Sequence, residues 1–240
     1  MINKISIIFP IYNEESRLPK SLIDIEKFIK LEKSLKTQII FVNDGSKDQG
    51  LNLLLAFKSR IKKKNVNITI VDIKKNVGKG KAISQGIKHV LYSWVLTSDI
   101  DMSVELKQFS EWKRQKFIKN NCSVYIGSRV HKKSNVKKTF LRHMLGLIMG
   151  QIVNFLFNLN HLDTQCGFKL YKKDIAKKIF HKLLRPRYEH DVEVMIRLKL
   201  RKIKVTELPV KWVHKANSKL NIIYDPVKMF LGIIILKFNY

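Results

Sequence analysis

Strand-like apolar runs alternate with segments of helical periodicity in the first hundred residues. The strand-like runs lie at 5–9, 39–42, 66–71 and 94–97. The segments between them, 18–35, 51–61 and 80–91, place apolar residues at helical spacing. Strands that are apolar on both faces and separated by helices are typical of a parallel sheet that helices cover on both sides. The pattern therefore predicts an α/β fold.

A polar segment follows each of these strand-like runs. The segments are 10–15, 43–48, 72 with 76–81, and 98–101. Because ligands of parallel sheets bind beyond the carboxyl ends of the strands, we expect the four segments to meet at one edge and form a site. Capping of the next helix by Ser46 or Asp48 explains one polar segment, but it does not explain all four.

The segment after the fourth run contains the acidic pair Asp99 and Asp101. Residues i and i+2 of an extended segment point the same way, so both carboxylates can face one cation. Oxygen ligands suit a hard divalent cation, whose remaining ligands are water and phosphate oxygens. The pair predicts an Mg²⁺ or Mn²⁺ site on a diphosphate.

The segment Asn76-Val-Gly-Lys-Gly-Lys81 combines glycines with lysines at the predicted start of a helix. It has neither the spacing of a nucleotide-hydrolase P-loop nor that of a dinucleotide fingerprint, which disfavours an ATPase or a dehydrogenase. Glycine permits close approach of the backbone, and a helix N-terminus favours anions. We expect this segment to contact phosphate.

The charge of the 240-residue chain is strongly basic, with 47 Lys and Arg against 19 Asp and Glu and a net charge of +28. Such an excess favours an anionic partner, which is nucleic acid, an anionic lipid surface or a phosphorylated substrate. No helix-turn-helix, RNP or zinc signature supports nucleic acid. The two cysteines, Cys122 and Cys166, lack metal-binding spacing and indicate a reducing compartment. With no signal-peptide pattern at the start, we expect a cytoplasmic protein.

Two apolar segments in the second half are candidates for a membrane interface. Residues 140–157 predict one long amphipathic helix beside the lysine-rich stretch 132–138, and 225–238 predict a second. The longest C-terminal apolar run, 229–236, is far shorter than the roughly 20 residues of a membrane-spanning helix. We expect one domain at 1–220, with an interfacial helix at about 139–160, and a membrane-associated segment at 221–240. A core helix is the alternative for 140–157.

Seven motifs along the chain resemble those of one enzyme family. They are IFPIYNE at 8–14, VNDGS at 42–46, NVGKG at 76–80, DID at 99–101, GSR at 127–129, DTQCGFK at 163–169 and ELPVKW at 207–212. In this order they resemble the inverting family 2 glycosyltransferases, specifically the branch that acts on dolichyl or polyprenyl phosphate. The resemblance implies a GT-A fold, whose Rossmann-like sheet is mainly parallel, with C-terminal interface helices.

The resemblance also implies substrates and residue roles. The donor would be a UDP- or GDP-linked hexose, glucose or mannose, and the acceptor a polyprenyl phosphate at the cytoplasmic face of a membrane. Nucleotide-sugar binding would fall to Pro10, Tyr12, Glu14, Asp44, Asn76, Gly78, Lys79 and Asp99, with Asp44 on the base. Asp101, Asp163 and Arg129 would act in catalysis. Asp99 and Asp101 would bind the metal, and Gln165, Ser218 and Lys219 would bind the acceptor. Two departures from the family pattern are Asn217, where relatives have glycine, and Met102-Ser103.

The chemistry of the acceptor decides the role of Asp163. A phosphate monoester has a second pKa of about 6 and is already ionised near neutral pH, so it needs no general base. Asp163 would then orient other groups, whereas with a hydroxyl acceptor it would be the base. Transfer to a saccharide hydroxyl in cell-surface polysaccharide synthesis is therefore the main alternative, and nucleic-acid binding a remote one. Cys166 is expected to be a packing residue.

Overall fold

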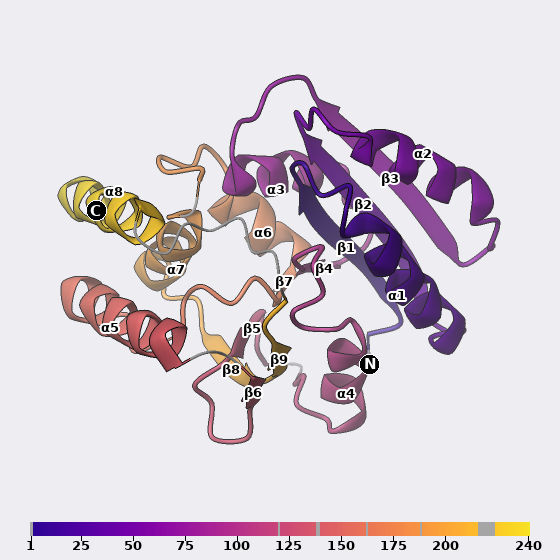
Figure 1. The fold of residues 1–240 in the computed structure, drawn as a ribbon. Coiled ribbons are helices and arrows are strands. Elements are labelled where there is room, and N and C mark those ends of the chain that lie inside the picture. The colour runs from indigo at the N-terminus through magenta and orange to yellow at the C-terminus, as the bar shows by residue number, and fades with distance from the viewer. Residues whose placement is uncertain (1, 120, 138–139, 162, 188, 216–223) are drawn as a thin grey trace.

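The computed structural model describes residues 2–119, 121–137, 140–161, 163–187, 189–215 and 224–240, shown in Figure 1. Its centre is a seven-stranded sheet with the order β3-β2-β1-β4-β7-β5-β8. The strands are β1 (Lys4–Ile11), β2 (Lys36–Asp44), β3 (Val66–Ile73), β4 (Trp94–Thr97), β5 (Val124–Ser128), β7 (Lys169–Lys172) and β8 (Val205–Pro209). Only β7 runs antiparallel to its neighbours, β4 and β5. The predicted α/β fold with a mainly parallel sheet is confirmed.

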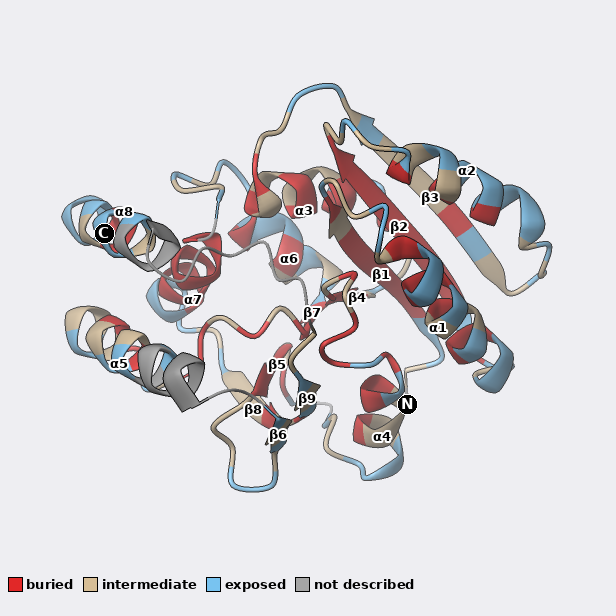
Figure 2. Cartoon of the chain, in the orientation of Figure 1, coloured by how far each residue is buried: buried red, intermediate tan, exposed pale blue. Residues whose placement is uncertain are grey.

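Helices cover both faces of this sheet (Figures 1 and 2). On one face lie α1 (Leu18–Leu31), α2 (Gly50–Arg60) and α4 (Lys107–Arg114), and on the other α3 (Lys79–Lys88), α6 (Lys173–Ile179) and α7 (His190–Leu200). The three helices predicted from periodicity are confirmed, and α1 ends a few residues before the predicted boundary. Pro19 fits the first turn of α1, where its missing N–H leaves no bond unmade.

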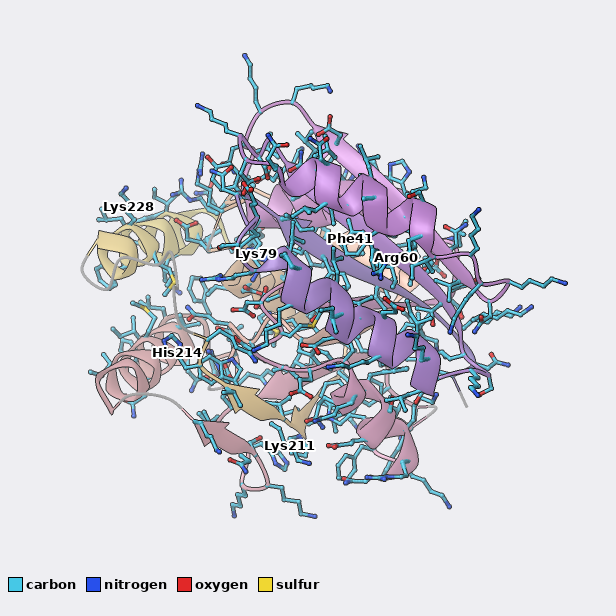
Figure 3. All side chains as sticks on the ribbon, turned by 45° about the vertical axis from the view of Figure 1, so that its right-hand side comes forward. Phe41, Arg60, Lys79, Lys211, His214 and Lys228 are labelled. Atoms are coloured by element: carbon cyan, nitrogen blue, oxygen red, sulfur yellow. The ribbon has the colours of Figure 1, made fainter. Side chains whose placement is uncertain are left out.

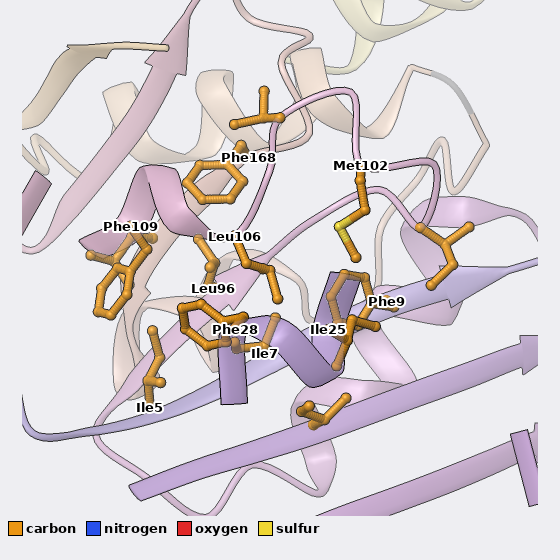
Figure 4. Close-up of a cluster of buried hydrophobic side chains, with 14 of the residues drawn as sticks. Ile5, Ile7, Phe9, Ile25, Phe28, Leu96, Met102, Leu106, Phe109 and Phe168 are labelled. Carbon is orange, nitrogen blue, oxygen red and sulfur yellow. The ribbon is translucent and has the colours of Figure 1, made fainter. Parts of the chain in front are cut away.

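The core has two halves because neighbouring side chains of the buried strands point to opposite faces of the sheet. On β1, Ile7 and Phe9 join the cluster under α1 and α4 shown in Figure 4, whereas Ile8 joins the cluster on the other face. Phe9 and Phe41 stack with ring centroids 5.7 Å apart. Burying each such side chain contributes roughly 1.5–3 kcal/mol, so the double-sided apolar runs explain why these strands are central.

A two-stranded parallel ribbon lies beside the loop that follows β4. It pairs β6 (Asn135–Lys137) with β9 (Lys211–Val213), and Trp212 also bridges to Val104 of that loop. Basic side chains lie on many parts of the surface (Figure 3); Arg60 and Lys211 pair with Glu26 and Glu111, and Lys228 is exposed on α8. The positive charge of the described residues is therefore spread over the surface.

The helices α5 (Phe140–Phe157) and α8 (Tyr224–Asn239) form the outer layer beside α7 (Figure 1). The prediction of one continuous helix at 140–157 is confirmed. Each helix buries part of its surface, including Val153 of α5 and Ile233 of α8. Other apolar side chains remain exposed on the two helices: Ile148, Phe155, Phe230, Leu231, Ile235 and Phe238. Neither helix is therefore wholly a core helix.

Among the described residues, no helix is both long enough and apolar enough to cross a membrane. The predicted boundary between residues 220 and 221 falls in the stretch 216–223, outside the described residues, and stays a prediction.

Candidate active site

The strand directions gather the predicted site residues at one edge of the sheet. The carboxyl ends of β1, β2, β3 and β4 share this edge because these strands are parallel. Since β7 is antiparallel to β4, its amino end lies there too, together with the preceding segment 163–168. The Thr97 hydroxyl, at the end of β4, donates a hydrogen bond of 2.9 Å to the Gly167 carbonyl. Segments far apart in the sequence are thus joined at the site.

The predicted metal ligands lie directly after β4. Asp99 Oδ1 pairs with Lys79 Nζ at 2.7 Å, and Asp101 Oδ1 accepts a hydrogen bond from the Ser103 N–H at 2.9 Å. Burial, together with the negative charge of Asp99, raises the pKa of Asp101. Gly167 leaves room for Asp99, since a Cβ at this position would lie 2.5 Å from Asp99 Oδ2. Two neighbouring carboxylates that disfavour each other's charge are stabilised by a cation, so these residues fit a divalent metal.

The described residues hold no group of three or more His, Cys, Asp or Glu side chains that would enclose a metal ion. A metal at Asp99 and Asp101 therefore needs further oxygen ligands from water or a bound phosphate.

Asp44 holds the segment between β3 and α3 in place. Its Oδ1 accepts a hydrogen bond from the Val77 N–H at 2.8 Å, and its Oδ2 accepts from the Gly78 N–H and from Asn76 Nδ2, both at 2.9 Å. Burial raises the pKa of Asp44, and the two backbone N–H groups oppose this rise. Gly78 has φ of 95°, a conformation that favours glycine. The predicted contact of Asp44 with a nucleotide base stays a prediction.

The expected contact of the segment 76–81 with phosphate stays a prediction, but amides at the N-terminus of α3 are already used within the protein. The N–H groups of Gly80 and Lys81 donate hydrogen bonds to the Pro186 carbonyl, at 2.7 and 3.3 Å. Those of Val77 and Gly78 donate to the Asp44 carboxylate. Lys79 is the member of this segment that reaches Asp99. Burial alone would lower the pKa of Lys79, but nearby carboxylates, Asp99 above all, raise it by more. Lys79 therefore carries its charge at neutral pH.

The loops after β1 and β2 are tied to each other. Asn13 N–H donates to Ser46 Oγ at 3.0 Å, and Glu15 N–H donates to Asp48 Oδ2 at 2.9 Å. Ser46 and Asp48 thus join two loops, and Asp48 Oδ1 also accepts from the Gly50 N–H at the start of α2.

The three residues predicted to border the nucleoside lie on the first of these loops and its strand. Pro10 is part of β1, Tyr12 is 40% exposed just after it, and Glu14 pairs with Arg17 at 3.2 Å. The structure brings Pro10, Tyr12 and Glu14 to the edge that holds Asp44. Their contacts with a nucleoside stay predictions.

The buried Asp163 pairs with the partly exposed Arg129 at the same edge. The Asp163 carboxylate accepts from the Arg129 N–H, Nε and Nη2 at 2.7, 2.8 and 2.7 Å. Burial alone would raise the pKa of Asp163, but Arg129 outweighs it and holds that pKa below its ordinary value. The Arg129 guanidinium also lies over the Trp212 ring, 5.9 Å from its centroid. With these three hydrogen bonds, Asp163 can orient the Arg129 guanidinium.

The predicted acceptor residues are only partly described. Gln165 Nε2 lies 3.0 Å from Met229 Sδ, so α8 reaches the site at this point. Ser218 and Lys219 lie outside the described residues. Next to Ser103, a hollow of about 230 Å³ is lined by Lys107, Lys137, Lys211 and Lys215 together with Glu105.

The sequence reasoning missed a buried charge cluster at the start of α7. Lys169, at the amino end of β7, pairs with Asp191, and His190 Nε2 lies 3.5 Å from Asp191 Oδ2. Burial opposes the charge of Asp191, but His190, Lys169 and Lys79 together lower its pKa to about 2. The available signal is Lys169 itself, a charged residue beside the apolar pair Leu170-Tyr171, where a partner is expected.

Comparison with solved structures shows the class of fold. Glucosyl-3-phosphoglycerate synthase from Mycobacterium tuberculosis, in complex with Mn²⁺, UDP and phosphoglyceric acid, superposes with a TM-score of 0.72 at 13% identity. The match covers 98% of this chain and 78% of that one. The protein therefore has the GT-A fold of nucleotide-sugar transferases, as the motifs led us to expect.

Sequence comparison shows the family. The family described as "Glycosyl transferase family 2" matches residues 6–180. A "Dolichyl-phosphate beta-glucosyltransferase" of Dictyostelium discoideum is 34% identical over 98% of this chain and 74% of its own length. The Homo sapiens protein of that name is 30% identical over 99% of this chain and 76% of its own. The chain belongs to glycosyl transferase family 2.

Proposed function

We propose that this enzyme transfers glucose, with inversion, from a nucleotide diphosphate sugar to a polyprenyl or dolichyl phosphate. The likeness to dolichyl-phosphate beta-glucosyltransferases over nearly the whole chain supports this substrate pair. In the reaction, an oxygen of the acceptor phosphate forms a bond to the anomeric carbon as the bond to the nucleotide diphosphate breaks. A UDP-linked donor is favoured by the fold neighbour, which was solved with UDP.

The observation that carries the choice of acceptor is the Arg129–Asp163 pair. Both oxygens of Asp163 accept hydrogen bonds from Arg129, so this carboxylate is already engaged and is a poor general base. An ionised phosphate acceptor needs no base, but it does need a cation that holds it. Arg129, fixed by Asp163 and Trp212, is the residue that we assign to that task.

Asp99 and Asp101 would hold Mg²⁺ or Mn²⁺. When bound, the metal supplies Lewis-acid stabilisation of the charge that develops on the departing diphosphate. Lys79, 2.7 Å from Asp99, adds a positive charge at the same place.

The exposed apolar side chains of α5 and α8 support attachment to a membrane surface. Phe155 and Phe238 are 85% and 86% exposed, and α8 also touches Gln165 through Met229. Apolar side chains that enter the headgroup region, with lysines that meet anionic lipids, would hold the site next to a lipid substrate. We therefore propose a peripheral location on the cytoplasmic face.

The test is a donor panel with a polyprenyl phosphate in detergent, following labelled sugar into the organic phase. UDP-glucose is expected to be the best donor, ahead of GDP-mannose. Asp99→Asn and Asp101→Asn are each expected to reduce turnover at least about 100-fold, as loss of an important electrostatic stabiliser does. Removal of the metal with EDTA is expected to reduce turnover in the same way. Asp174→Asn, at an exposed carboxylate on α6, is the matched control and is expected to keep full activity.

Three results would contradict parts of the proposal. Transfer to saccharide hydroxyls but not to polyprenyl phosphate would overturn the acceptor. A preference for GDP-mannose would overturn the sugar. Full activity of both aspartate variants in EDTA would overturn the metal.

A further inference from the structure

The segment 184–187, which connects α6 to α7, is fixed by buried charged side chains of α7. Glu193 accepts hydrogen bonds from the N–H groups of Leu184 and Arg185, at 2.9 and 2.8 Å. The Arg197 guanidinium donates to backbone carbonyls just before the segment, those of Ile179, His181 and Lys182. Because these bonds hold the backbone at residues 179–182 and again at 184–185, the start of the segment is fixed in place.

That position places the segment directly on the loop that precedes α3. The Pro186 carbonyl accepts hydrogen bonds from the N–H groups of Gly80 and Lys81. A Cβ at Gly78 would lie 2.9 Å from Arg187 Cγ, so the two segments are in contact. Arg187 therefore lies beside Asn76 and Gly78, two residues of the predicted nucleotide-sugar site.

A phosphate bound at this loop would need a cationic side chain, because the backbone amides of the loop already form hydrogen bonds within the protein. The backbone N–H groups of Val77, Gly78, Gly80 and Lys81 are all used within the protein, so they do not supply donors to a phosphate. Lys79, in turn, is paired with Asp99. Positive charge for a diphosphate beyond that of a metal ion and Lys79 would then come from a further side chain.

Arg187 has the required free donors. One of its nitrogens, Nη1, donates to Asn76 Oδ1 at 3.3 Å, and the side chain is exposed. Among the described residues, no carboxylate forms an ion pair with Arg187, whereas Lys79, Arg129 and Lys169 each have one. A guanidinium carries five N–H donors in a planar fork that matches phosphate oxygens, so most of them are available to a ligand.

We propose that Arg187 is a further substrate-binding residue, which contacts the diphosphate of the nucleotide sugar across the loop 76–79. The inference rests on the proposed function, because it takes the donor to be a nucleotide diphosphate sugar. It also gives a function to the fixed backbone of 184–187, which holds this guanidinium at the site before the donor arrives.

The test is calorimetric titration of the full chain with UDP and with GDP, in the presence of Mg²⁺, and with uridine and guanosine as uncharged probes. Arg187→Gln is expected to weaken binding of the preferred nucleoside diphosphate about 10- to 100-fold, the value of charge-assisted hydrogen bonds. Arg187→Lys, which keeps the charge but not the fork, is expected to be intermediate. Lys178→Gln makes the same charge change at an exposed position of α6 and is expected to stay within about twofold of wild type.

The outcomes separate this inference from the function on which it rests. If wild type binds neither diphosphate, the proposed function fails and the inference fails with it. If wild type binds and Arg187→Gln binds equally well, the inference alone is overturned. A loss that is as large for the uncharged nucleoside as for the diphosphate would also overturn it, because Arg187 would then act on the nucleoside. Thermal melts check folding, and Arg187→Gln is expected to melt as wild type does since backbone bonds hold the segment.

Discussion

Replacement of Asp163 by alanine removes the acceptor of three hydrogen bonds from Arg129 and leaves that guanidinium without its counter-ion. Removing one partner of a buried pair costs about 3–5 kcal/mol. The Arg129 side chain keeps 24% of its surface exposed, against 4% for Asp163, so water replaces part of the lost interaction. We therefore expect Asp163→Ala to lower the free energy of unfolding by about 3 kcal/mol.

The assay is urea unfolding followed by the fluorescence of the three tryptophans. The midpoint is expected to fall with an unchanged m-value, and for a chain of this size the melting temperature is expected to fall by roughly 6–12 °C. Asp163→Asn keeps the shape and one acceptor oxygen, so its cost is expected to be smaller, about 1–2 kcal/mol. In a double-mutant cycle with Arg129→Gln, the two losses should be far from additive.

The pH dependence has a definite sign. Because the pKa of Asp163 is lowered in the fold, its contribution is complete above the unfolded-state value of about 3.9 and is lost as the pH falls through the lower folded value. The stability of wild type should therefore begin to fall towards that of Asp163→Asn below about pH 4 and meet it only below the lower folded-state pKa.

The same variant tests the assigned role in catalysis. If Asp163 orients Arg129, Asp163→Asn should lose activity equally at all pH values near neutrality. Recovery of its activity at high pH would refute the reasoning, because that behaviour marks a lost general base. Unchanged stability of Asp163→Ala would refute the energetic argument.

Three further predictions concern other parts of the molecule. Gly78→Ala should lower the free energy of unfolding by about 1–3 kcal/mol, since φ is 95° and its Cβ would meet backbone at 2.9 Å; equal urea midpoints would contradict this. Both cysteines are buried, and burial raises the pKa of the Cys166 thiol to about 12, so neither Cys122 nor Cys166 should react with a thiol reagent at pH 7 until urea unfolds the chain. Phe155→Ser with Phe238→Ser should weaken co-sedimentation with anionic vesicles without lowering the melting temperature, and a wild type that ignores vesicles would contradict the membrane proposal.

The central strands could be predicted because both of their faces are buried. The runs at 5–9 and 39–42 correspond to β1 and β2, which extend only a few residues further. The place of β7 could not be predicted in this way. This strand has four residues and begins with Lys169, and its insertion between β4 and β5 depends on pairing with partners distant in sequence. Local periodicity carries no information about such pairings.

The site was predictable to the extent that it depends on strand ends. Polar residues after buried strands had to meet at one edge once the sheet was parallel, and Asp44, Asp99 and Lys79 do so. The hydrogen bonds of the amides could not be inferred, because the Pro186 carbonyl that accepts from Gly80 comes from a segment more than a hundred residues away. A glycine-rich loop shows that the backbone can approach a partner closely, but it does not identify the partner.

Three aspartates of the site, Asp99, Asp163 and Asp191, differ in how firmly each one holds its cation. Asp163 and Asp191 expose 4% and 11% of their side chains and pair with Arg129 and Lys169. Such buried pairs are costly to break, so they fix the positions of the side chains before any substrate binds. Asp99 exposes 40% of its side chain to solvent while it pairs with Lys79. Since water reaches Asp99 more than the other two carboxylates, Asp99 is the one of the three that can exchange its partner for a metal ion at the smallest cost. The exchange would free Lys79 for the phosphates that arrive with that metal.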